Sequence, residues 1–227
     1  MCLPMNPLEY LRLQLRLEGK EIVYGNLLRQ VEIVPDEDMP LMVIAHLADQ
    51  GLAIYFDEGF PQCEELQKQV SEISSPDIEP LFTLLKNRNI TFEVGHHKTY
   101  TFPEMYAAFK DETVNWFSRH DPKVKDFGFG GFAEEVYAME QAGKIVSACV
   151  STRENEFCGE AWVYTDPEYR HKGFAQKVVG AWAAKLISSG RVPFYSHKIE
   201  NIASTNLARH LGLQPVFEEI VISYSNV

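Results

Sequence analysis

The stretch Thr165-Asp-Pro-Glu-Tyr-Arg170-His-Lys-Gly173-Phe-Ala175 joins two segments of different periodicity. Before it, residues 161–165 are bulky, aromatic and β-branched, which favours a strand. After it, apolar residues recur at 174, 175, 178, 179, 182, 183, 186 and 187, the spacing of one helix face. Basic residues and a glycine therefore stand at the predicted start of a helix. Unpaired N–H groups and the helix dipole attract a phosphate or pyrophosphate there.

This stretch carries a family resemblance. Arg170-x-x-Gly173-x-Ala175 resembles the R/Q-x-x-G-x-G/A signature of the GNAT N-acetyltransferase superfamily, whose loop cradles the pyrophosphate of coenzyme A. Residues 193–213 resemble the family's fifth strand, its fourth helix, which starts at an asparagine, and its closing Leu-Gly-Phe. The resemblance runs from about Val136 to Ile222. It implies an α/β fold with a mixed, largely antiparallel sheet flanked by helices, in an acetyltransferase domain over residues 101–227.

Composition narrows the possible partners and the compartment. The net charge of −11 disfavours nonspecific binding to nucleic acid or to an anionic membrane. No apolar run approaches the roughly 18 to 20 residues of a membrane span, and the N-terminus lacks the pattern of a signal peptide. The four cysteines lack metal-ligand spacing and are typical of reduced thiols. We therefore expect a cytoplasmic protein without a metal site, and the sequence leaves the oligomeric state open.

Residues 1–100 predict an accessory α/β region. Asn6-Pro7 is typical of a helix start, whereas leucines at 11, 13, 15 and 17 alternate with the strand period. A helix from Pro7 to Leu17 is the preferred interpretation. Further helices are predicted over residues 61–73 and 78–86, and strands over 30–34, 52–56 and 90–94. His96 and His97, after the last of these strands, are interpreted as solvated loop residues rather than metal ligands, because neighbouring strand residues point to opposite faces.

Residues 103–165 predict one helix and then hairpins. The helix runs from Pro103 to about His120. Phe127-Gly-Phe-Gly-Gly-Phe132 lacks the ending of a phosphate loop, so it is either an aromatic loop beside the acceptor site or a structural turn. Strands over 136–140 and 144–150 are joined by a hairpin, and a turn near 153–155 leads to a strand over 157–165. If residues 152–155 form the turn, Cys149 lies opposite Cys158 and a disulfide is possible. The last strand is predicted over 216–224.

The resemblance implies which residues hold acetyl-CoA. The loop would bind the pyrophosphate mainly through backbone N–H groups, and a backbone N–H on the preceding strand would polarise the thioester carbonyl where that strand bulges. An ordinary strand-to-helix turn is the alternative for the loop, and helix capping is the alternative for Asn201. The implied cofactor-binding residues are Val163, Tyr164, Thr165, Arg170, His171, Lys172, Gly173, Phe174, Ala175, Asn201 and Ser204.

The catalytic residues follow from the same resemblance. A lysine-like amine has a pKa of about 10.4. At neutral pH it therefore needs a base to remove its proton, either directly or through a chain of water molecules. Glu160 is the first candidate base and His197 the second, while the backbone of Val163 or Tyr164 would polarise the carbonyl. Ala208 stands where many relatives have a tyrosine that acts as the general acid. Either the thiolate leaves without that acid, or Ser204, Tyr195 or a water serves.

These features predict an acetyl-CoA-dependent N-acetyltransferase. A primary amine would attack the thioester directly in a ternary complex, because no cysteine or serine stands in a nucleophile motif. One alternative is a non-catalytic module that senses coenzyme A or acyl-CoA. Another is an interaction protein that has lost the cofactor. The sequence gives neither the acceptor nor the acyl-chain length.

Overall fold

The chain divides into two compact units in the computed structural model, which describes residues 5–35, 38–47, 51–60, 63–71 and 78–225. The first unit comprises residues 1–98 and 216–227, and the second comprises residues 99–215. Two strands, β5 (Phe92–Thr101) and β11 (Gln214–Tyr224), continue along the chain from one unit into the other. The expected division into residues 1–100 and 101–227 stays a prediction.

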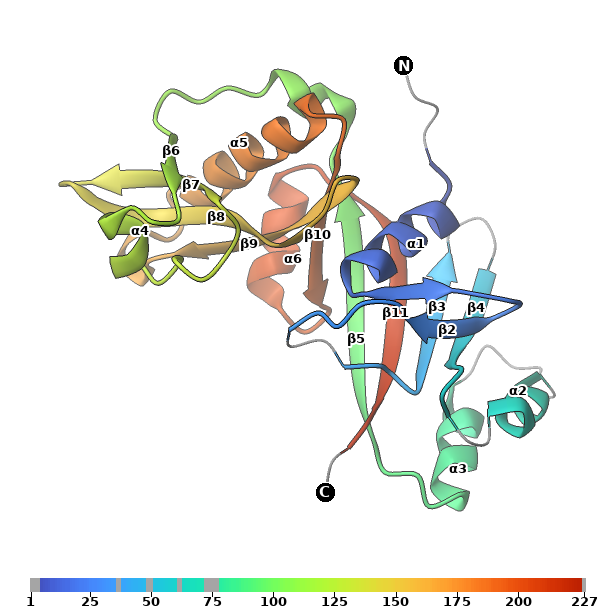
Figure 1. The fold of residues 1–227 in the computed structure, drawn as a ribbon. Helices are drawn as coiled ribbons and strands as arrows, with labels where there is room; N and C mark the ends of the chain where they lie inside the picture. The colour runs from blue at the N-terminus through green and yellow to red at the C-terminus, as the bar shows by residue number, and fades with distance from the viewer. Residues whose placement is uncertain (1–4, 36–37, 48–50, 61–62, 72–77, 226–227) are drawn as a thin grey trace. The chain divides into compact units, whose positions relative to one another are not determined.

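The first unit is a mixed sheet with helices. Its strands follow the order β1-β2-β4-β3-β11, in which β2 and β4 are parallel and the other pairs antiparallel. The predicted first helix is confirmed, and a capping box starts it: Asn6 Oδ1 accepts from Glu9 N at 3.0 Å, and Glu9 Oε2 accepts from Asn6 N at 2.8 Å. Before β5, the elements are α1 (Pro7–Leu17), β1 (Lys20–Ile22), β2 (Leu27–Gln30), β3 (Met42–Leu47), β4 (Gly51–Asp57), α2 (Cys63–Ser71) and α3 (Glu79–Asn87) (Figure 1).

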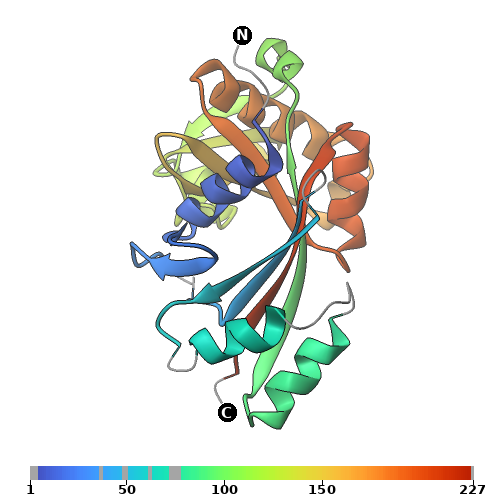
Figure 2. The same ribbon diagram turned by 90° about the vertical axis from the view of Figure 1, so that its right-hand side faces the viewer.

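Alternating residues of β3 supply two separate cores in this unit. Met42 and Ile44 pack in a cluster with residues of α2 and α3. Val43 and Ala45 pack in a second cluster with Leu11 and Leu15 of α1. Because successive strand residues point to opposite faces, α1 covers one face of the sheet and α2 and α3 cover the other (Figure 2).

The second unit follows the predicted strand, strand, strand, helix, strand, helix order from β7 to α6. Its strands lie in the order β10-β9-β8-β7-β6, and only β9 and β10 are parallel. The elements are η1 (Glu104–Ala108), β6 (Asn115–Ser118), α4 (Pro122–Asp126), β7 (Glu135–Gln141), β8 (Lys144–Glu154), β9 (Cys158–Thr165), η2 (Pro167–Tyr169), α5 (Phe174–Ser188), β10 (Val192–Lys198) and α6 (Ile202–His210), where η marks a short 3₁₀ helix (Figure 1).

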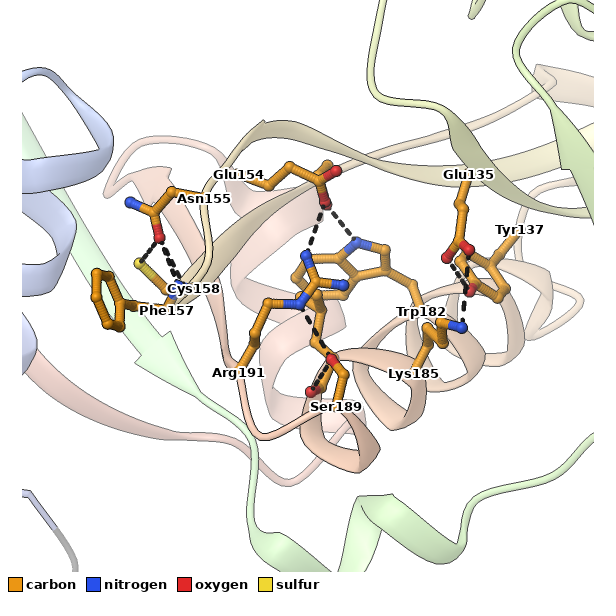
Figure 3. A network of polar contacts seen from close by, with 12 residues as sticks. Glu135, Tyr137, Glu154, Asn155, Phe157, Cys158, Trp182, Lys185, Ser189 and Arg191 are labelled. Atoms are coloured by element: carbon orange, nitrogen blue, oxygen red, sulfur yellow. Dashed lines mark hydrogen bonds and ion pairs between the residues drawn. The ribbon is translucent and has the colours of Figure 1, made fainter. Parts of the chain in front are cut away.

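Trp182 anchors α5 to one face of this sheet. Its indole Nε1 donates to Ser151 Oγ at 3.0 Å from within a cluster that includes Cys149 and Ala161. Around it, Lys185 Nζ lies 3.7 Å from Glu135 Oε1, and Arg191 Nη1 lies 3.5 Å from Glu154 Oε2 (Figure 3). These contacts orient the long helix whose first turn follows Gly173.

Two predicted elements are wrong. The helix expected over residues 103–120 is replaced by η1, a loop and β6, in which Phe117 pairs with Val136. The strand expected over 30–34 lies earlier, as β2, because Leu28 is the buried residue and the apolar Val31 and Ile33 are exposed. The spacing of apolar residues led to both errors, because apolar residues that are exposed in the fold give the same pattern as a buried helix or strand face.

The cysteine and histidine expectations need correction too. The β8–β9 turn closes later than expected, with Asn155 N donating to Cys158 O at 2.9 Å. Cys149 therefore pairs with Val163 rather than lying opposite Cys158, and neither cysteine forms a disulfide with another described residue. His96 lies within β5 rather than in a loop, with Nε2 at 3.8 Å from Glu218 Oε2.

Candidate functional site

The segment between β9 and α5 forms a cradle of backbone N–H groups. Asp166 starts η2 by accepting from Glu168 N at 3.1 Å. His171 and Gly173 then take left-handed conformations, with φ of 60° and 75°. Gly173 is the N-cap of α5 and has no side chain to satisfy the first N–H groups of that helix. The turn therefore leaves these donors for an anion, at the positive end of the helix dipole.

The strands β9 and β10 separate beside this cradle. Within the described chain, their parallel pairing runs from Val192↔Cys158 to Phe194↔Glu160, although β9 continues to residue 165 and β10 to residue 198. The register irregularity in the β8–β9 pairing lies on β8, between Ser151 and Arg153, and not on β9 as the family resemblance implied. Val163 and Tyr164 thus lie on the part of β9 that pairs only with β8.

A groove of about 770 Å³ occupies this separation. Ten of the eleven residues expected to bind the cofactor line it, and Lys172 does not. Instead, Lys172 Nζ donates to Glu168 O at 3.1 Å and lies 4.7 Å from the centroid of the Tyr169 ring. The lining residues are Val163, Tyr164, Thr165, Tyr169, Arg170, His171, Gly173, Phe174, Ala175, Gln176, Tyr195, Asn201, Ala203, Ser204, Asn206, Leu207, Arg209 and His210.

The groove is basic in a chain with a net charge of −11. Arg170 and Arg209 line it together with His171 and His210, and no carboxylate is among the described lining residues. The Arg170 guanidinium is held by the bond from Nε to Thr165 O, 3.1 Å long, and lies 5.9 Å from the centroid of the Tyr164 ring. This distribution favours an anionic ligand with more than one charged group.

The α6 wall of the groove carries two polar groups beside Tyr195. Asn201 caps α6, with Oδ1 accepting from Ser204 N at 3.1 Å, and Ser204 is hydrogen-bonded to the Tyr195 hydroxyl. Burial raises the pKa of Tyr195 to about 12, so the phenol stays protonated even at mildly alkaline pH. Ala208 is buried in the cluster that includes Tyr195. A hydroxyl that can donate therefore reaches the groove from β10.

The two candidate bases lie outside the groove lining. Glu160 is buried and ion-paired with Arg153, whose Nε donates to Glu160 Oε2 at 3.0 Å. His197 is also buried, and its Nδ1 lies 2.9 Å from Lys198 O. The Nε2 of His197 has no hydrogen-bond partner among the described residues, and its ring lies 6.0 Å from that of Tyr195.

Sequence reasoning missed much of the α6 wall. Ala203, Asn206, Leu207 and His210 line the groove at spacings of three and four residues, which is one face of a helix. The basic pair Arg209 and His210, in the last turn of α6, was the signal that could have identified it.

The described residues show neither a metal site nor a membrane-spanning helix. They hold no cluster of three or more histidine, cysteine or acidic residues that could bind a metal ion. None of the described helices has both the length and the apolar character needed to cross a membrane.

Comparisons with known proteins identify a family and similar solved structures. A family model described as GNAT acetyltransferase matches residues 60–221. Among solved structures, a GNAT-family protein from Novosphingobium aromaticivorans is 17% identical, with a TM-score of 0.50, and the match covers 59% of this chain and 66% of that one. A GCN5-related N-acetyltransferase-like protein from Streptococcus suis is 15% identical, with a TM-score of 0.47 and coverage of 85% and 87%. No curated protein matches the sequence.

Proposed function

Because this chain belongs to the GNAT acetyltransferase family, we propose that it transfers an acetyl group from acetyl-CoA to a primary amine of a small molecule or peptide. The observation that carries the proposal is the basic groove between β9 and β10, with the N-terminus of α5 at its edge. In this proposal the amine attacks the thioester directly while both substrates are bound.

The groove residues fit coenzyme A. The N–H groups at Gly173 and in the first turn of α5 would bind the pyrophosphate. A side chain at position 173 would strain the left-handed turn, since Gly173 takes a φ of 75°. Arg170 would add charge beside the cradle. When bound, acetyl-CoA supplies an acetyl group activated as a thioester. The backbone N–H of Val163 or Tyr164 would donate to its carbonyl oxygen.

Removing the amine proton is assigned to Glu160 or to His197. Glu160 lies two residues from Trp162 on the same face of β9, but it is buried and its carboxylate is paired with Arg153. His197 has a free Nε2, although a water would have to link that atom to the groove. Glu160 stays the first candidate because it lies on the strand that would polarise the carbonyl.

Stabilising the leaving thiolate is assigned to Tyr195 with Ser204. Both residues line the groove and their hydroxyls are hydrogen-bonded to each other. The Tyr195 phenol would donate a hydrogen bond to the sulfur as negative charge develops there. This assignment compensates for Ala208, which cannot donate.

Residues 1–100 would act as an accessory region to the acetyltransferase domain of residues 101–227. A reducing compartment such as the cytoplasm is proposed from the sequence, whose four cysteines lack metal-ligand spacing. The acidic chain is not expected to bind nucleic acid.

A second function is favoured by one observation. Ala208 removes the hydroxyl found at this position in many relatives, which suits a module that binds coenzyme A or acyl-CoA as a sensor without turnover. Both functions need the groove. Release of free coenzyme A in the presence of an amine distinguishes the enzyme from the sensor.

The first experiment is a thermal-shift measurement with acetyl-CoA on the parent protein and on Gly173→Glu. A ligand at about a hundred times its dissociation constant adds roughly 2.7 kcal/mol to the free energy of unfolding. We expect a clear rise in melting temperature for the parent and none for the variant, because a carboxylate would stand at the phosphate cradle.

Gly190→Glu is the matched control. Gly190 follows the other end of α5 with a φ of 77°, so a side chain there has the same left-handed strain, about 1–2 kcal/mol. The control should lose stability as Gly173→Glu does and yet keep the full shift with acetyl-CoA. Absence of a shift in the parent would contradict both the enzyme and the sensor.

A further inference from the structure

An aromatic surface lies on the face of β9 opposite α5. Trp162 stacks on Phe129 with ring centroids 4.8 Å apart and planes at 10°, and the ring centroids of Phe132 and Trp162 lie 4.1 Å apart. The ring centroids of Phe127 and Tyr164 lie 5.7 Å apart. We call these five residues the aromatic wall. The intervening residues 161 and 163 instead pack in the α5 cluster, so the alternation of β9 fixes which face the wall occupies.

The wall is more exposed than a structural core requires. Trp162 and Tyr164 are each 41% exposed, whereas Phe129, which stacks on Trp162, is 2% exposed. The glycines of Phe127-Gly-Phe-Gly-Gly-Phe132 allow the loop to bring three rings against one strand, and Gly128 takes a φ of 87°. The loop thus supports Trp162 from one side and leaves part of the indole accessible.

The wall is continuous with the cofactor groove. Tyr164 belongs to the wall and also lines the groove, on the part of β9 that does not pair with β10 among the described residues. An acceptor resting on Trp162 and Tyr164 would therefore lie next to the backbone groups that are proposed to polarise the thioester.

The charges around the wall limit what it can accept. Glu160, on the same face of β9, is paired with Arg153, and Glu134, next to the Phe132 loop, is 3.1 Å from Arg119 Nε. Arg170 already lies against the Tyr164 ring. Two paired carboxylates and a nearby arginine do not favour a polycation, whereas flat exposed rings favour an apolar or aromatic group.

We propose that the aromatic wall binds the acceptor, and that this acceptor is a monoamine whose amino group is carried on a flat apolar body such as an aromatic ring. The inference rests on the proposed acetyl transfer and narrows its substrate class. Trp162 would be the residue that determines specificity, through contact with the acceptor rather than with coenzyme A.

The test compares acetylation of phenethylamine and spermidine by the intact protein and its variants. We expect kcat/KM for phenethylamine to exceed that for spermidine by about tenfold or more, and Trp162→Ala to reduce it by about tenfold, chiefly through KM, as the loss of an aromatic contact predicts. Trp162→Phe should restore most of the activity. The KM for acetyl-CoA should stay within twofold of the parent, as a rough limit for a residue outside the groove.

Trp116→Ala is the control, because Trp116 is 57% exposed in the same unit but lies on β6, outside the wall. A preference for spermidine, or equal effects of Trp162→Ala and Trp116→Ala, would overturn the inference. If no amine is acetylated, calorimetric binding of phenethylamine to the protein saturated with coenzyme A decides. If the parent binds phenethylamine and Trp162→Ala does not, the aromatic wall is supported as a binding site although the proposed reaction is not. If the parent does not bind phenethylamine, the proposal for the aromatic wall is overturned.

Discussion

At the residue scale, Tyr195 explains how the groove accommodates alanine at position 208. Ser204 and Ala208 are one turn apart on α6, so they share a face. The Tyr195 hydroxyl binds Ser204, and its ring packs in the same cluster as Ala208. A tyrosine at 208 would compete with the Tyr195 ring for this volume. A phenol therefore reaches the groove from β10, next to the buried Ala208.

Tyr195 also predicts an alkaline loss of stability. Burial raises its pKa from an ordinary 10 to about 12, so the folded protein keeps a proton that the unfolded chain releases. Its contribution is complete below pH 10 and is lost as the pH rises toward 12. Between pH 9 and 12 the parent should therefore lose about 2 to 3 kcal/mol more of its free energy of unfolding than Tyr195→Phe does.

Urea denaturation at several pH values measures this difference. Tyr24→Phe is the control, because the Tyr24 side chain is exposed in the β1–β2 turn. Equal alkaline slopes for the parent and Tyr195→Phe would contradict the prediction.

At the element scale, local signals were predictable and tertiary ones were not. The capping box of α1 and the stripe of α5 lie within their own segments, so the sequence alone identified both helices. The helix expected over 103–120 failed because its apolar residues serve different partners. Phe109 packs against Gly180 of α5, and Asp111 Oδ2 lies 3.0 Å from Lys177 Nζ. The cradle was likewise predictable, whereas the α6 wall required the fold.

The contact between Phe109 and Gly180 makes a prediction whose sign is unusual. Replacing a glycine inside a helix by alanine normally stabilises by about 0.5–1 kcal/mol. A Cβ at Gly180 would lie 2.7 Å from Phe109 Cζ, so Gly180→Ala should instead destabilise the protein by displacing the ring. In a Phe109→Ala background the same change should stabilise by the normal amount. Urea denaturation of the parent, the two single variants and the double variant measures both effects. If Gly180→Ala alone stabilises the protein, the Phe109 ring can move aside at little cost and the prediction is wrong.

At the scale of the whole molecule, the chain combines an acidic total with a basic site. The net charge of −11 belongs to all 227 residues, while the groove residues are neutral or basic. The family match begins at residue 60 in the first unit and ends at residue 221, so neither unit by itself corresponds to the matched region. Coenzyme A is an anion, so the net negative charge of the protein would repel it at long range, whereas the basic residues of the groove would attract it at short range.

This contrast predicts how salt affects binding. Charges separated by more than about 10 Å are largely screened at 0.1 M ionic strength, whereas contacts within the groove are screened less. At low salt Arg209→Gln should weaken acetyl-CoA binding by up to about fivefold, as expected for losing one exposed ion pair, and should make the affinity less dependent on salt. Lys144→Gln changes the net charge equally but lies at the β7–β8 hairpin, outside the groove, and should leave the affinity unchanged. Calorimetric titrations at low and high salt compare the three proteins. If both variants weaken binding alike, the net charge rather than the α6 wall controls affinity, and Arg209 does not contact the ligand.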